Sequence, residues 1–382
     1  MLRKCFCRKD HCSCTLREAG PFVRERVESA HVRIPRRKFL QSSFAAGILT
    51  TGPSLNLGQP LRTRKVSKTI DIHAHYFPTE YLDLLDRFGG SETGTAIARN
   101  CLAGKEDGDL EARFRVLEEA GIDMQVLSIP PQAPYFENEQ QGMEAARLAN
   151  DLCAGLARQY PQRFKVFACF PLPHIDASLK ELARGMDELG MVGAVVATSV
   201  RGKSIADPAF SPLFAELNRR RAVLFIHPVG IGACSPCIVG AGLTWPVGAP
   251  FEDTICALEL MKANIPARYP NLKIILSHLG GTLPFLMRRL DHQAPMFMSK
   301  DSEKPSVLAR SFWYDTVNGH RAALSDACEC YGADRILMGT DYPYWRTEMK
   351  LCVNYIREAC LPTSDVVAIL GGTAQKLLAP QL

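Results

Sequence analysis

The sequence predicts an α/β protein built as a (β/α)₈ TIM barrel that follows an N-terminal leader. Short apolar runs rich in β-branched residues recur eight times, and segments with helical spacing separate them. This alternation is typical of parallel strands that are buried on both faces and joined by helices. The 382 residues suffice for one barrel of roughly 250 residues with extensions. A doubly wound open sheet is the weaker alternative, since neither a Gly-x-Gly-x-x-Gly motif after the first run nor a P-loop is present.

The eight expected strands are Thr69–His75, Met124–Pro130, Lys165–Leu172, Val192–Thr198, Ala222–Pro228, Lys273–His278, Phe312–Val317 and Arg335–Asp341. Between the third and fourth strands, one helix face carries an apolar stripe made of Leu179, Leu182, Met186 and Leu189. Asp207 followed by Pro208 predicts a capped helix start, and Gly121 predicts a helix end. We expect a final helix over Ser364–Leu378 to close the ring.

Composition and charge indicate a soluble globular domain that follows a basic N-terminal segment of about 65 residues. Apolar residues make up 47% of the chain and charged residues 22%, the usual balance for a soluble globular protein. The formal net charge is +5, but the basic excess lies in the first 65 residues and the remainder is close to balanced. Because the body carries no basic face with interleaved aromatic residues, we expect no nucleic-acid binding.

The N-terminal segment predicts an export signal. We take residues 1–66 as a disordered leader and residues 67–382 as the barrel domain. Arg36 and Arg37 precede a short apolar run over 42–50, which resembles a twin-arginine signal and predicts a periplasmic protein. A cytoplasmic protein is the alternative. The run is shorter than the about 20 residues of a spanning helix, so we expect no integral membrane segment.

The cysteines do not define a metal site or a redox site. Those of the leader resemble a metal cluster in composition only, because their spacing differs from the Cys-x₂-Cys pattern of zinc sites; they are Cys5, Cys7, Cys12 and Cys14, and their role stays open. In the body, Cys234 and Cys237 lie in a loop rich in glycine and proline rather than at a helix start. We expect inert thiols there, with a disulfide as the alternative if the protein is exported.

Histidines and one aspartate gather at the ends of the expected strands. His73 and His75 close the first strand, and their spacing of two places both on the same side. His227, His278 and Asp341 close the fifth, sixth and eighth strands. Because the carboxyl ends of barrel strands meet at one mouth, these five side chains converge. Imidazole and carboxylate ligands suit Zn²⁺ best, with Mn, Fe and Co as further options.

The pattern resembles the amidohydrolase superfamily, in the branch of the aminocarboxymuconate-semialdehyde decarboxylases. The motifs that carry the resemblance are Asp71–His75, Ser277–Phe285, Gly339–Pro343 and Gly371–Ala374. The resemblance covers about residues 69–378 and implies a barrel of the metal-dependent hydrolase type. It also implies His73, His75, His227 and Asp341 as ligands of one metal, with His278 and Asp341 as catalytic residues. Binuclear members carry a lysine at the end of the fourth strand, where this chain has Ala197-Thr198-Ser199, so we expect a single metal.

Side chains around the expected mouth suggest how a substrate is held. The position of Arg99 resembles that of an arginine that binds a substrate carboxylate in this branch. An arginine in a loop that contacts only solvent is the equal alternative for Arg99. Asp315 either lines the mouth or supports a metal ligand from behind. We expect aromatic side chains to line the mouth of the barrel at Trp245, Phe251, Tyr342, Tyr344 and Trp345. The alternative is that these rings only pack against the rim of the barrel.

The resemblance favours a metal-dependent carboxy-lyase for a small unsaturated or aromatic carboxylic acid, acting without an oxidant. The same residues serve a hydrolase of a lactone, ester or amide, which is the first alternative. A binding protein that keeps the barrel without activity is the second. The expected partners are a small carboxylic acid and, because relatives are often dimers, a second copy of the chain.

Overall fold

The computed structural model describes residues 68–90, 94–99, 101, 103–104, 108–317 and 319–379. The leader, its twin-arginine motif and Cys5, Cys7, Cys12 and Cys14 lie outside these residues. The domain boundary at residue 66 therefore stays a prediction.

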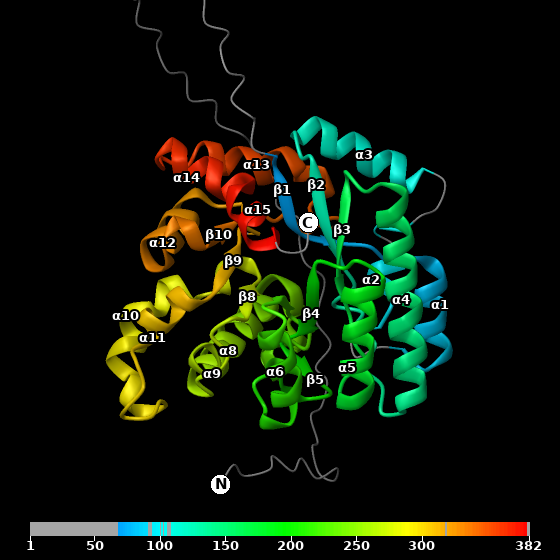
Figure 1. The fold of residues 1–382 in the computed structure, drawn as a ribbon. Coiled ribbons are helices and arrows are strands. Elements are labelled where there is room, and N and C mark those ends of the chain that lie inside the picture. The colour runs from blue at the N-terminus through cyan, green and yellow to red at the C-terminus, as the bar shows by residue number, and fades with distance from the viewer. Residues whose placement is uncertain are drawn as a thin grey trace, which may run out of the picture. The chain divides into compact units, whose positions relative to one another are not determined.

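Eight parallel strands form the centre of the molecule (Figure 1) and confirm the predicted barrel. In the order of the sheet they are β1 (Ile70–His75), β2 (Met124–Ser128), β3 (Phe164–Ala168), β4 (Gly193–Ala197), β7 (Val223–His227), β8 (Lys273–Leu276), β9 (Trp313–Asp315) and β10 (Ile336–Leu337). A small antiparallel pair, β5 (Ser199–Val200) with β6 (Lys203–Ser204), follows β4. Each of the eight lies inside or within one residue of a run expected from the sequence.

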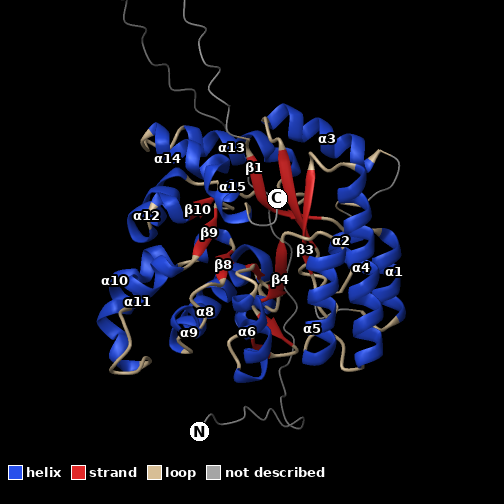
Figure 2. Ribbon diagram, in the orientation of Figure 1, coloured by secondary structure: helices blue, strands red, loops and turns tan. Residues whose placement is uncertain are grey.

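Helices surround the strands as an outer layer (Figure 2). They are α1 (Thr79–Arg87), α2 (Ala96–Arg99), α3 (Asp109–Ala120), α4 (Glu139–Gln159), α5 (Ile175–Ala183), α6 (Ser211–Arg219), α7 (Pro236–Gly240), α8 (Ala249–Lys262), α9 (Ile265–Arg268), α10 (Leu283–Gln293), α11 (Pro305–Leu308), α12 (Arg321–Tyr331), α13 (Met349–Arg357), α14 (Thr363–Val367) and α15 (Thr373–Leu378). The predicted helix end at Gly121 is confirmed by its left-handed φ of 72°. The Asp207 side chain caps the short helical turn Pro208–Phe210, accepting from the amide of Ala209 at 2.8 Å.

The last strand is shorter than expected and ends at Leu337. The amide of Met338 donates to the carbonyl of Ile369 at 2.9 Å and the amide of Gly339 to the hydroxyl of Thr316 at 3.0 Å, so neither amide pairs with a neighbouring strand. Asp341 has φ of 55°, a left-handed conformation that a strand does not contain. Because β10 is short, separate backbone hydrogen bonds between β1 and the loop after β10 close the barrel. The amide of Ile72 donates to the carbonyl of Met338 at 2.9 Å, and the amide of Asp341 donates to the carbonyl of His73 at 2.8 Å. Asp341 therefore lies in a loop that is attached to β1.

The final helix is interrupted, contrary to the continuous helix expected over Ser364–Leu378. A wide turn over Ala368–Gly372 separates α14 from α15. A side chain at Gly371 would overlap the carbonyl oxygen of Lys68, the residue that leads into β1. The break lets the start of the first strand pass close to the end of the chain.

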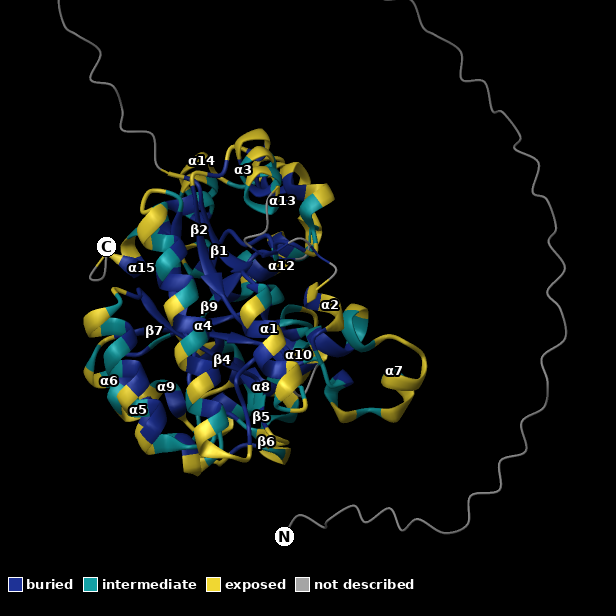
Figure 3. Cartoon of the chain, turned by 90° about the vertical axis from the view of Figure 1, so that its right-hand side faces the viewer, coloured by how far each residue is buried: buried dark blue, intermediate teal, exposed yellow. Residues whose placement is uncertain are grey.

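The core lies inside the strands and between the strands and helices, as the buried residues in Figure 3 show. All six residues of β1 and all five of β7 are buried, as expected of strands with helices outside and side chains filling the barrel. Among the described residues, no helix combines the length and the apolar character needed to cross a membrane.

Candidate metal centre

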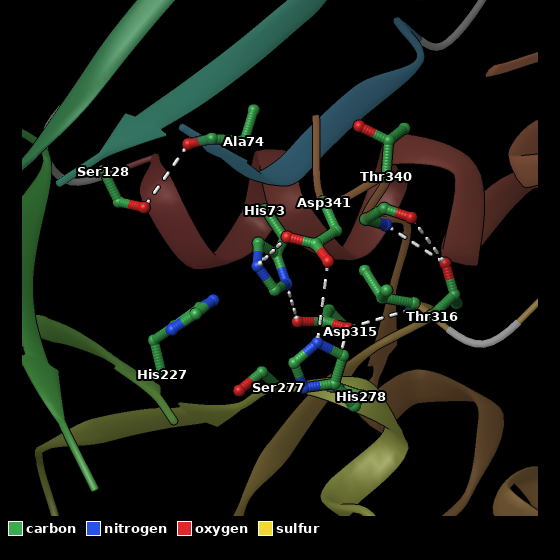
Figure 4. A network of polar contacts seen from close by, with 12 residues as sticks. His73, Ala74, Ser128, His227, Ser277, His278, Asp315, Thr316, Thr340 and Asp341 are labelled. Carbon is green, nitrogen blue, oxygen red and sulfur yellow. Dashed lines mark hydrogen bonds and ion pairs between the residues drawn. The ribbon is translucent and has the colours of Figure 1, made fainter. Parts of the chain in front are cut away.

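Four side chains at the carboxyl end of the barrel form one compact set of ligands. His73 and His75 come from β1, His227 ends β7, and Asp341 follows β10. One potential ligand atom from each residue lies within 4.8 Å of the other three. The three histidines are buried, and the side chain of Asp341 is 13% exposed. Figure 4 shows His73 and Asp341 side by side, with His227 pointing toward them from the opposite strand. The four predicted ligands are thus brought together.

Each histidine of the set uses its Nδ1 atom for a partner outside the set. His73 Nδ1 lies 2.7 Å from Oδ2 of Asp315, and His75 Nδ1 lies 3.1 Å from the hydroxyl oxygen of Ser128. His227 Nδ1 lies 2.7 Å from the carbonyl oxygen of Pro228. Such partners fix the ring orientation and the tautomer of metal-binding histidines and leave Nε2 for the ion.

The inner atoms of the set face one another without other partners from the described chain. His73 Nε2 lies 3.2 Å from His75 Nε2, and Oδ1 of Asp341 lies 3.0 Å from His75 Nε2 and 3.3 Å from His73 Nε2. Buried lone pairs at such distances repel each other unless a cation or a proton lies between them. A three-imidazole, one-carboxylate set with its outer nitrogens already engaged fits a divalent transition metal.

Burial and neighbouring charges give His75, His227 and Asp341 the ionisation states that metal binding needs, whereas His73 holds a proton that a metal would displace. Burial lowers the pKa of His75 to about 4 and holds the pKa of His227 well below its usual range, so both rings are neutral near pH 7. Burial also acts against the protonated form of His73, but Asp315 and Asp341 outweigh it and raise its pKa to about 9. Against the effect of burial, His73 and the neighbouring histidines hold the pKa of Asp341 well below its usual range. A bound cation would take the place of the proton that His73 holds.

A second buried network holds the Asp341 loop against β1. Oδ1 of Asp71 accepts from the amide of Thr340 at 3.0 Å, and Oδ2 accepts from the hydroxyl of Thr340 at 2.6 Å and from the side-chain amide of Gln125 at 2.7 Å. Gln125 in turn accepts from the fully buried Arg113, whose second nitrogen donates to the carbonyl of His75 at 3.0 Å. This network positions the two segments that carry His75 and Asp341. Asp71 and Thr340 belong to motifs recognised in the sequence, whereas Gln125 and Arg113 do not.

His278 lies beside the set in the turn that follows β8. Its Nε2 is 3.9 Å from Oδ2 of Asp341, and its Nδ1 is 2.7 Å from Oδ2 of Asp253. Its backbone is left-handed at φ of 51°, a strained conformation that often marks a functional position. Sequence reasoning missed Asp253, because no local pattern links an acid within α8 to a histidine in the loop after β8.

A cavity of about 550 Å³ opens onto the metal set. This volume suits a small molecule. Its lining is largely aromatic and aliphatic, and includes Ile97, Trp245, Pro246, Val317, Tyr344 and Trp345 beside His227, His278 and Asp341. Trp245, Tyr344 and Trp345 thus take the places expected of them. Phe251 is 39% exposed on α8, and the ring of Tyr342 packs under the Arg113 guanidinium in the core, so neither borders the cavity among the described residues.

The structure does not bring Arg99 to this cavity. Its guanidinium donates to Asp86 at 2.6 Å and to Asp83 at 2.8 Å, both on α1. These two carboxylates satisfy the charge of Arg99 at the surface. Of the described cavity-lining side chains, none is an arginine or a lysine.

Comparisons with known proteins agree with this geometry. A family model described as amidohydrolase matches residues 70–379. Over 332 residues the chain is 28% identical to the 2-amino-3-carboxymuconate-6-semialdehyde decarboxylase of Dictyostelium discoideum, which covers 82% of this chain and 92% of that protein. It is 30% identical to the 6-methylsalicylic acid decarboxylase of Penicillium expansum, over 72% of this chain and 84% of that protein.

Among solved structures, the chain is similar to a dihydroxybenzoic acid decarboxylase from Polaromonas sp. JS666 that holds manganese and the inhibitor 2-nitroresorcinol. The TM-score is 0.70 and the identity 27%, over 83% of this chain and 98% of that chain.

Proposed function

The chain belongs to the amidohydrolase family, as its motifs predicted, and on that premise we propose that it is a metal-dependent decarboxylase of a small aromatic carboxylic acid. The observation that carries the proposal is the placement of His278, which stands between the metal set and an aromatic cavity. The relatives named above are decarboxylases, which supports the carboxy-lyase prediction over the hydrolase alternative.

The reaction replaces a carboxylate by a proton. The bond between the ring carbon and the carboxylate breaks, CO₂ leaves, the electron pair stays on the carbon, and a proton forms the new C–H bond. A divalent ion held by His73, His75, His227 and Asp341 would supply positive charge that stabilises developing negative charge on the substrate. His278 delivers the proton from Nε2 and regains one from solvent. Although burial opposes it, the carboxylates of Asp253 and Asp341 raise the pKa of His278 well above its usual range, so the ring carries that proton near neutral pH.

The cavity walls orient the substrate ring. Trp245, Tyr344 and Trp345 offer flat faces to an aromatic ring, and their apolar surface excludes water from the carbon that receives the proton. With Arg99 engaged elsewhere, a substrate carboxylate depends on the metal and on His278 for its charge partners.

Zinc remains our proposal for the metal, because three imidazoles and a carboxylate are ligands that zinc accepts. Manganese is the alternative, supported by the similar structure that holds it. Elemental analysis of the purified full chain distinguishes them: about one transition metal per chain is expected. The matched control is the double variant His73→Ala/His75→Ala, which loses two ligands and the metal with them.

The test of the activity is CO₂ release by the metal-loaded full chain from 6-methylsalicylate and from dihydroxybenzoates, with a phenyl ester offered in parallel. We expect CO₂ from at least one acid and none with His278→Gln, which keeps the metal. Ester cleavage without CO₂ release from any acid would favour the hydrolase. Metal binding without either reaction would favour the binding protein.

Export and assembly are further proposals that rest on the sequence. We propose that the Arg36-Arg37 pair directs the folded chain out of the cytoplasm. Cell fractionation should find the chain in the periplasm and the Arg36→Lys/Arg37→Lys variant in the cytoplasm; equal distribution of the two would contradict export by this route. A homodimer stays a prediction, which sedimentation of the purified protein checks.

A further inference from the structure

The N-terminal half of α8 carries two adjacent buried carboxylates, Glu252 and Asp253, which contact different loops at the mouth of the barrel. Glu252 faces the loop after β7. Its two oxygens accept four backbone amides, from Val229 at 2.9 Å, Gly230 at 3.1 Å, Ile231 at 2.8 Å and Ala233 at 3.3 Å. The Glu252 carboxylate thus binds the backbone of the loop after β7, whereas the Asp253 carboxylate contacts the loop after β8.

Asp253 makes two short contacts with consecutive residues of the β8 loop. Its Oδ2 lies 2.7 Å from Nδ1 of His278, and its Oδ1 accepts from the hydroxyl of Ser277 at 2.9 Å. Asp253 is 1% exposed, so no bulk water competes for these oxygens. A buried carboxylate with one oxygen on an imidazole holds the ring in one orientation and keeps its proton on Nδ1.

The helix and the loop are fixed against each other by close packing as well. The Thr254 hydroxyl accepts from the amide of Thr282 at 2.8 Å. A side chain at Gly281, whose φ is 67°, would overlap the carbonyl oxygen of Pro250 and lie 2.5 Å from the Thr254 hydroxyl. Because the backbones meet this closely, the distance between Asp253 and His278 has little freedom to change.

We propose that Asp253 is a positioning residue for His278: its carboxylate accepts the Nδ1 proton and thereby directs Nε2 to the cavity and the metal set. The proposal rests on the proposed function, in which His278 is the proton donor. No step passes through Asp253 itself, which touches neither the metal ligands nor the cavity. A base or acid held from behind by a third group is a general arrangement in enzymes that transfer protons.

Two measurements test the proposal, and the first does not depend on turnover. In the zinc-loaded full chain labelled with ¹⁵N-histidine, the signals of His278 are identified by their loss in His278→Gln. We expect a protonated Nδ1 bonded to a carboxylate. A neutral His278 with its proton on Nε2 and an unprotonated Nδ1 would overturn the proposal, whether or not a substrate has been found.

The second measurement compares kcat and KM of Asp253→Asn with the wild type on the acid that releases CO₂. Removing a hydrogen bond to a charged partner is expected to lower kcat about ten- to a hundredfold, with KM within about threefold and the metal content unchanged. The control is Glu259→Gln on the same helix, whose carboxylate accepts from Ser204 at 2.6 Å away from the site; its kcat should stay within about twofold.

The outcomes separate the two proposals. Loss of metal in Asp253→Asn, a kcat within twofold of wild type, or an equal fall in Glu259→Gln would each overturn the positioning role. If the wild type releases no CO₂ from any acid, the proposed function fails, and the histidine signals still decide whether Asp253 holds Nδ1.

Discussion

Oδ2 of Asp315 lies 2.7 Å from Nδ1 of His73, and both side chains are completely buried. Asp315 ends β9 and His73 lies in β1, so the contact joins strands 242 positions apart in the chain. The other oxygen of Asp315 accepts the amide of His278 at 3.0 Å. One carboxylate therefore orients a metal ligand and fixes the segment that carries the proposed proton donor, which decides between the two roles left open for Asp315.

Asp315→Asn should weaken metal binding by about 10- to 100-fold, the usual cost of removing such a support. The amide keeps the shape of the carboxylate but loses the charge that favours a metal-bound imidazole. Competition with a chelator measures the affinity, and Asp326→Asn on the surface of α12 is the control. An affinity equal to wild type would show that His73 is oriented without Asp315.

Gly281→Ala should lower the free energy of unfolding by at least about 2 kcal/mol, because the new methyl group overlaps α8 and the φ of 67° disfavours alanine. Gly155→Ala is the matched control. Gly155 lies inside α4 with open space where a side chain would be, so alanine there should stabilise by about 0.5–1 kcal/mol. Urea denaturation measures both; equal stability of the two variants would contradict the close approach.

Glu252→Gln should destabilise the protein by about 2–4 kcal/mol. The carboxylate accepts four backbone amides, whereas a glutamine NH₂ group would face two of those donors and leave them unsatisfied. Urea denaturation gives the free energy, and hydrogen exchange should show faster exchange over residues 229–233. If Glu252→Gln is as stable as Glu259→Gln, the loop over residues 229–233 keeps its conformation without the Glu252 carboxylate.

Trp245→Ala should raise KM for the aromatic acid about tenfold and leave kcat within about threefold. The ring lines the cavity and packs against Gly230, where any side chain would displace it. Loss of aromatic contact removes binding energy that ground state and transition state share. Phe285→Ala, which removes a ring that is 88% exposed on α10, is the control. A fall in kcat with unchanged KM would place Trp245 in proton delivery instead.

Glu216→Gln should lower the melting temperature at pH 7 by about 2 °C, a small effect because solvent screens the pair. Hydrogen bonds from Arg219, and then Arg220, lower the pKa of Glu216 from 4.5 to about 2. A depressed pKa stabilises the folded state above pH 4.5, and the contribution is lost as the pH falls toward 2. The difference from wild type should therefore shrink between pH 4.5 and pH 3.5. A constant difference, or an equal change in Glu144→Gln, would contradict this assignment.

Sequence patterns were sufficient to assign the strands and to place five side chains at one mouth, and the family resemblance selected the four metal ligands among them. Periodicity marks buried strands, and the carboxyl ends of barrel strands meet at one mouth, so His73, His75, His227 and Asp341 were expected there together with His278. The resemblance also identified the family, because the motifs around these ligands are specific.

The side chains that support that set could be assigned only from the folded chain. Asp253, Asp315 and Ser128 act through contacts between segments that are separated along the chain, and no local pattern records such contacts. Arg99 shows the reverse case: the family resemblance suggested a substrate contact, with a solvated arginine as the alternative, and folding places Asp83 and Asp86 beside it. Local spacing dictates which way a strand residue points, whereas the partner it meets depends on how helices and loops pack across the barrel.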